Sequence, residues 1–164
     1  MGRLNEDGSV ADGSETILMR VNASGYGGDP VSLFAAYKPA SDLLLVVDER
    51  RYMAGPLDGY VLFTTTDRDE SYDILFDREM LRDAIAAYFD MKSTRRVEIA
   101  AKVSKHDPET RIQQKGVDER GIKYELDAPT NGQIAVLMAA HLTAQQRGAV
   151  KAIEMMDDFM AFTI

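Results

Sequence analysis

The residue types that most often carry chemistry are sparse in this chain. It has no cysteine, and its 2 histidines, His106 and His141, are far apart. No H-x-x-x-H or H-E-x-x-H pair supplies zinc ligands, and no serine lies in a G-x-S-x-G turn. His106 lies in a polar turn, where an exposed side chain without a role is expected, and His141 lies near the inner edge of a predicted helix. The sequence predicts no catalytic residue, no metal site and no cofactor.

Two segments resemble ligand-binding loops but lack the deciding residues. The glycines within residues 24–30 would let the backbone approach a phosphate, yet Pro30 takes the place of the third glycine of the dinucleotide fingerprint. The acidic residues 67–70 resemble the start of a calcium loop, but Tyr72 and Arg78 replace its glycine and its last glutamate. We predict a hairpin-type loop and a solvated turn. A carboxylate pair that forms only on folding, as in a glycosidase or a nuclease, stays open as an alternative.

Composition and charge narrow the class of protein. The chain is 45% hydrophobic and 28% charged, with a net charge of −8, which is ordinary for a globular domain. Residues 92–120 are the only basic block, with 8 basic and 5 acidic side chains, so we expect no nucleic-acid partner. No run of 18 apolar residues and no signal-peptide core is present, so we expect no membrane contact.

The apolar patterns predict an α+β fold. Residues 1–14 are a predicted flexible lead-in, residues 15–104 form an α+β domain, and residues 105–120 are a polar connection. Within the domain we predict a mostly antiparallel sheet and one helix over residues 78–91 that Asp77 caps. Residues 43–47 form an unbroken apolar run, which predicts a strand that is covered on both faces. The predicted strands cover residues 16–21, 31–37, 43–47, 60–66 and 95–104.

Residues 121–164 predict a strand followed by a helical hairpin. Apolar and charged residues alternate over 122–126, as in a half-buried strand. Thr130 and Gln133 form a T-x-x-Q capping box, which starts a first helix. Thr143 and Gln146 repeat that signal, so we predict that a second helix begins there with Thr143 as its cap.

The second predicted helix has an apolar stripe that two short helices cannot bury alone. Apolar residues recur at three- and four-residue steps, while the charged residues fall elsewhere on the wheel. The stripe stays apolar up to residue 164, so we predict that it binds another protein or a second copy. The predicted partner-binding residues are Ile153, Met156, Phe159 and Met160.

A family resemblance is carried by APTNGQIAVLMAAH and by the following KAIEMMDDFMAF. Together they resemble the tail assembly chaperones of long-tailed phages that infect actinobacteria, over about the last quarter of the chain. The resemblance implies a non-enzymatic chaperone in the host cytoplasm whose partner is the tape measure protein of the tail. Methionines can adapt to irregular apolar partners, although plain core packing is the commoner role of any single one.

An alternative from another class stays open. The chain could be a phage structural component or a small regulatory module that contacts its partner through a sheet edge. Neither hypothesis requires an enzyme.

Overall fold

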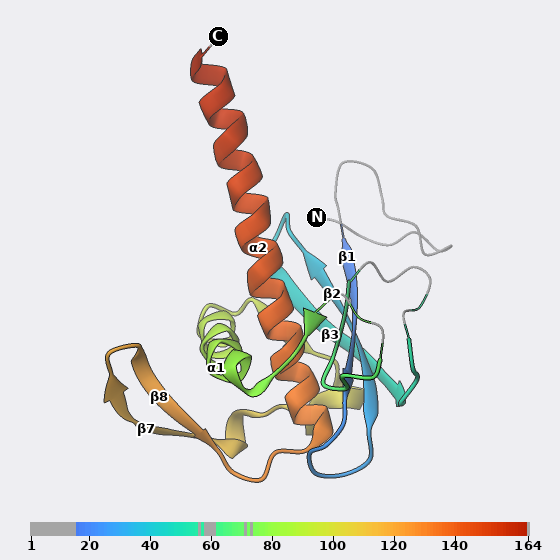
Figure 1. Cartoon of the computed structure of the whole chain (residues 1–164). Coiled ribbons are helices and arrows are strands. Elements are labelled where there is room, and N and C mark those ends of the chain that lie inside the picture. Colours follow the sequence, from blue (N-terminus) through green and yellow to red (C-terminus); the bar gives the residue numbers. More distant parts are fainter. Residues whose placement is uncertain (1–15, 56, 58–61, 71, 73, 164) are drawn as a thin grey trace.

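The computed structural model describes the backbone of residues 16–163 apart from residues 56, 58–61, 71 and 73. Side chains of residues 62, 63 and 149–163 also lie outside the described part, as does the predicted lead-in. The fold is α+β, as the sequence predicts: a six-stranded sheet, two α-helices and a separate two-stranded hairpin (Figure 1).

The sheet has the strand order β5-β4-β1-β2-β3-β6. Its three long strands form an antiparallel centre, because the β1–β2 and β2–β3 connections are too short for the crossover that a parallel pair requires. The outer pairs β1–β4, β4–β5 and β3–β6 are parallel, which the sequence analysis did not anticipate. The strands are β1 Ile17–Ala23, β2 Val31–Lys38, β3 Leu43–Arg51, β4 Leu62–Thr65, β5 Ile74–Leu75 and β6 Val97–Ile99.

Two strand predictions need correction. In β3 only Leu44 and Val46 are fully buried, and Val47 is 39% exposed, so the strand is covered on one face and not on both. The predicted strand 95–104 is paired only over β6. It then turns into the 3₁₀-helix Ala101–His106, where Val103 is buried.

Helix α1 spans Arg78–Ser93 and begins as predicted. Asp77 is in an extended conformation, and its carboxylate accepts a hydrogen bond from the backbone N–H of Met80 at 3.1 Å. Its inner face consists of Ala84, Ile85, Tyr88 and Met91, all buried. The helix packs against the longer helix α2.

The predicted helical hairpin is wrong, because a single helix, α2, runs unbroken over Asn131–Thr163. Every residue from 131 to 143 is buried. The buried part packs on β1, β2, β3 and α1, and its residues share one hydrophobic core with them. Figure 1 shows that the C-terminal half of the helix extends beyond this body.

The predicted polar connection 105–120 contains a strand of its own. After a short 3₁₀ turn, Glu109–Arg111, strand β7 spans Ile112–Asp118 and pairs antiparallel with β8, Gly121–Leu126. The two residues between them form a tight turn. The predicted strand near 122–126 is therefore correct, but its partner is β7 and both strands lie outside the main sheet.

Candidate functional site

The N-terminus of α2 is held by two sets of contacts. Thr130 and Gln133 form the predicted capping box: the Thr130 hydroxyl accepts from the Gln133 N–H at 3.2 Å, and the Gln133 side chain accepts from the Thr130 N–H at 3.0 Å. The loop before β2 adds a second set, because Asn131 N donates to Gly27 O at 2.7 Å and Gly27 N donates to Pro129 O at 3.1 Å. The glycine-rich loop thus serves as a backbone dock for α2.

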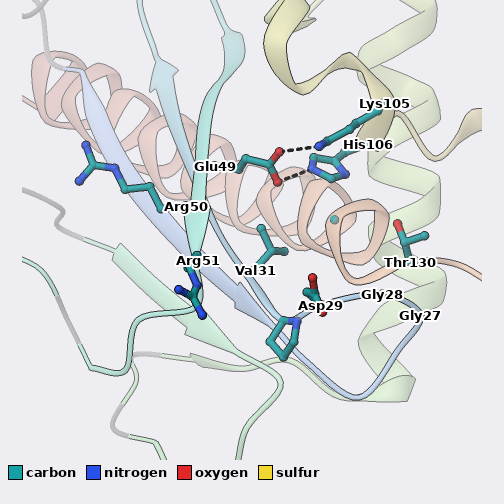
Figure 2. A pocket seen from close by; sticks show the side chains of 12 residues that line it. Gly27, Gly28, Asp29, Val31, Glu49, Arg50, Arg51, Lys105, His106 and Thr130 are labelled. Atoms are coloured by element: carbon teal, nitrogen blue, oxygen red, sulfur yellow. Dashed lines mark hydrogen bonds and ion pairs between the residues drawn. The ribbon is translucent and has the colours of Figure 1, made fainter.

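A surface cavity of about 610 Å³ lies beside this dock (Figure 2). On its wall His106 Nε2 lies 2.6 Å from Glu49 Oε2, and Lys105 Nζ lies 3.1 Å from Glu49 Oε1. A Cβ at Gly132 would lie 2.0 Å from His106 Nδ1. The His106 side chain is therefore wedged between β3 and the first turn of α2, with 12% exposed, and is not the exposed histidine that the sequence predicts.

Glu49 on this wall has a structural role, because Lys105 and His106 both contact its carboxylate. Burial acts to raise the pKa of Glu49, but hydrogen bonds from His106 and Lys105 outweigh it and hold the pKa below its usual value. Arg50 and Arg51 extend away from the pair in Figure 2, and the Arg50 guanidinium lies over the Phe34 ring. Among the described residues, no group of three or more potential metal ligands is assembled.

A second polar cluster lies on the sheet face away from the helices. Glu70 is only 9% exposed and accepts hydrogen bonds from Asn22 at 3.1 Å, from Tyr52 at 2.5 Å, from the Thr65 hydroxyl at 3.0 Å and from Gly55 N. The predicted solvated turn 67–70 is thus wrong at Glu70. Its carboxylate ties the loop to the sheet, and buried polar groups need such partners.

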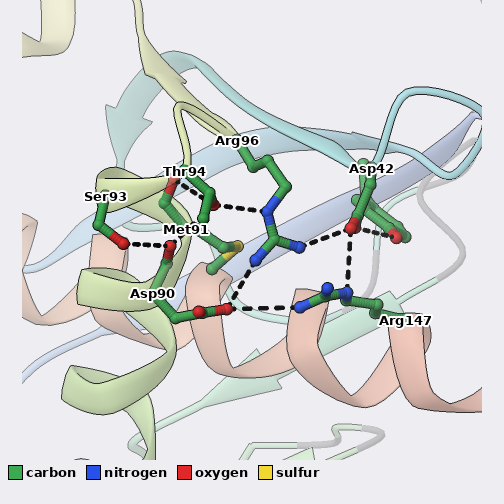
Figure 3. A network of polar contacts seen from close by, with 8 residues as sticks. Asp42, Asp90, Met91, Ser93, Thr94, Arg96 and Arg147 are labelled. Carbon is green, nitrogen blue, oxygen red and sulfur yellow. Dashed lines mark hydrogen bonds and ion pairs between the residues drawn. The ribbon is translucent and has the colours of Figure 1, made fainter.

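A ring of four alternating charges marks the point where α2 leaves the body (Figure 3). Arg96 lies between Asp42 at 2.5 Å and Asp90 at 2.6 Å, and Arg147 of α2 lies between the same two carboxylates at 3.0 Å and 3.4 Å. We call these four residues the charge clamp. It joins the β2–β3 turn, α1, the residue before β6 and α2.

The positions of the remaining predicted site residues are as follows. Thr143 is not a cap, because it is buried within α2 and its hydroxyl donates to the Ala139 carbonyl at 2.8 Å. His141 is nearly buried and packs edge-on against Phe76, and burial lowers its pKa. The four predicted partner-binding positions lie on the C-terminal half of α2, and their side chains are outside the described residues: Ile153, Met156, Phe159 and Met160.

Sequence reasoning missed the charge clamp. Its members come from four separate elements, and Asp90 and Arg147 are 57 residues apart. No local pattern predicts such a meeting. The available hint was compositional: residues 131–146 contain no Asp, Glu, Lys or Arg, and Arg147 is the first charge after them.

Comparisons with protein families, with curated proteins and with solved structures found no match. In the described part of the chain, no helix has the length and apolar character needed to cross a bilayer.

Proposed function

We propose that this chain is a protein-binding protein whose contact element is the C-terminal half of α2. One observation carries the proposal: a helix that is fully buried over residues 131–143 continues without a break past the body of the protein (Figure 1). Residues 149–163 add about 22 Å of helix at 1.5 Å per residue. Helix packing in the core and the charge clamp hold the base of this extension in place.

The sequence of the extension is amphipathic, and its apolar stripe is suited to burial against a partner. Its apolar residues recur at three- and four-residue steps, and the charged residues fall on the other side of the wheel: Lys151, Glu154, Asp157 and Asp158. A helix of this kind binds by laying its apolar stripe along another helix or into a groove. The geometry therefore supports a binding role more directly than an enzymatic one.

The resemblance of the C-terminal quarter indicates the partner class. We propose that the chain acts as a phage tail assembly chaperone in the host cytoplasm, and that it keeps a tape measure protein soluble. Such a protein is long and helical, so its apolar surface would aggregate if it were left uncovered. A rigidly based amphipathic helix suits this surface.

The sheet-edge alternative has weaker support. The edge strands of the main sheet, β5 and β6, have 2 and 3 residues, which is too short to seat an added strand. In the small sheet, the register of β7 shifts between Gln114 and Gly116, and such a bulge disrupts strand addition.

The proposal is tested by co-expression with a tape measure protein. Met156→Lys with Met160→Lys should leave the protein folded but abolish its ability to keep the partner in the soluble fraction. A matched control, Glu154→Lys with Asp157→Lys, adds charge to the polar side of the same half-helix and should retain activity. Unchanged solubilisation by the methionine variant, with its melting temperature intact, would exclude this helix as the contact element.

A further inference from the structure

Helix α2 contains two glycines, and only one of them has a steric reason. Glycine lowers the equilibrium constant for helix formation by about two- to fivefold relative to alanine, so its place inside a long helix needs an explanation. Gly132 has one, because a Cβ there would collide with the imidazole ring of His106. The other glycine, Gly148, is exposed.

Neither packing nor backbone conformation requires a glycine at position 148. Apart from its chain neighbours and the backbone of its own helix, no atom of the described residues lies within 4 Å of an ideal Cβ there. Its φ is not positive, because the residue lies within the continuous helix. Alanine would therefore fit at this position and would favour the helix.

Gly148 lies at the point where α2 leaves the body. The residue before it, Arg147, makes the α2 contacts of the charge clamp, with Asp42 at 3.0 Å and with Asp90 at 3.4 Å. Residues 149–163 then continue past the body (Figure 1). The glycine that packing does not require thus lies at the boundary between the held part and the projecting part of the helix.

We infer that Gly148 is a hinge at which the projecting half of α2 changes its direction relative to the body. The inference deepens the proposed function and rests on it for the use of the hinge in binding. A long helical partner sets the direction in which the apolar stripe must lie, whereas the first half of α2 is held by core packing. A hinge between the two halves lets the stripe align with the partner while the base stays in place.

The surroundings of Gly148 make a bend possible at low cost. Ala144 and Gln145, one turn earlier, are exposed on the same side of the helix. Water can therefore bond the backbone groups that a bend releases on this side, and helices bend with their water-facing side outermost. Glycine has no Cβ to shield these groups from water.

The hinge is tested on the full chain without any partner, by distances between spin labels. The chain has no cysteine, so pairs of introduced cysteines carry labels at defined sites. Glu98→Cys with Asp158→Cys spans the hinge, and Glu98→Cys with Gln145→Cys ends before it. Dilution in an excess of unlabelled chain restricts double electron–electron resonance to distances within one molecule. We expect a broad distribution for the first pair and a narrow one for the second.

Substitution of the glycine gives the decisive result. Gly148→Ala should narrow the distribution of the first pair, whereas the matched control Gln146→Ala should leave it broad. Ala152→Gly, added to Gly148→Ala, places a glycine one turn further along and should restore the breadth. The inference is overturned if the first pair is as narrow as the second in the parent protein, or if Gly148→Ala leaves its breadth unchanged.

Binding adds an independent readout. Gly148→Ala favours the straight helix, so about two- to fivefold more of this variant should be needed to keep half of the tape measure protein soluble. Narrowed distances with solubilisation equal to that of the parent would overturn the role of the hinge in binding. Weaker solubilisation with unchanged distances would overturn the hinge itself and would assign Gly148 to a close contact with the partner helix. The distances need no partner, so they test the hinge even if the proposed function fails.

Discussion

The two halves of α2 have similar apolar content but different surroundings. Residues 131–143 are buried on all sides, whereas residues 149–163 extend past the body (Figure 1). The buried half contains no charged residue, and its polar residues have partners within the protein, such as Thr143 with Ala139 O. The second half has charges on one side of the wheel. The comparison teaches that an uncharged stretch marks a core helix, while an amphipathic stretch marks a surface to be covered.

The largest expected effect is on the buried half. Leu137→Ala should lower the free energy of unfolding by about 2–5 kcal/mol, because it removes a fully buried side chain from a packed core. Met156→Ala should change it by less than about 1 kcal/mol. Urea denaturation of both variants, at a protein concentration where the parent is monomeric, measures the difference. Equal losses would mean that the second half is also core, and the contrast between the halves would disappear.

The charge clamp should have an intermediate effect at the boundary between the halves. Arg147→Ala should cost about 0.5–1 kcal/mol, because the Arg147 side chain is 30% exposed and water screens the pair. Gln146→Ala is the matched control and should cost less. The Arg147 effect should shrink in 1 M salt, where exposed ion pairs are screened. A salt-independent loss would point to packing by the arginine stem instead.

The clamp also predicts a pH dependence. Burial acts to raise the pKa of Asp42, but hydrogen bonds from Tyr37 and Arg96 and the nearby arginine charges hold it below its usual value. A carboxyl group with a depressed folded-state pKa stabilises the protein above its unfolded pKa of about 4. That stabilisation is lost as the pH falls through the folded pKa. Melts between pH 3 and 6 should therefore show a shallower acid loss for Asp42→Asn than for the parent.

The last comparison separates two similar threonines, and its smaller member is the smallest effect that we expect. Thr130→Ala should cost about 1 kcal/mol, because it removes the hydroxyl of the capping box. Thr143→Ala should change stability by only about a few tenths of a kcal/mol, since the lost buried methyl group is offset by the better helix propensity of alanine. Thermal melts of the two single variants measure this order. A larger loss at Thr143 would indicate that its contact with the Ala139 carbonyl matters more than its propensity.

Local chemistry in the sequence was sufficient to predict several elements. Asp77 begins α1 and Thr130 begins α2, because a side-chain oxygen can satisfy the free N–H groups of a first turn whatever lies around it. The long central strands and the α+β class likewise follow from apolar periodicity. The glycine-rich loop before β2 is a structural turn, as its glycine spacing indicates.

Tertiary structure decided which local signals mark the start of an element and which distant residues come into contact. The T-x-x-Q pattern at Thr143 does not start a helix, because the same hydroxyl can bond the carbonyl four residues earlier inside a continuous helix. The Glu49–His106 pair, the buried acceptor Glu70 and the charge clamp each join residues that are distant in the chain. Only folding brings such residues together, and the free energy of their contacts depends on burial and distance, neither of which is encoded in local spacing.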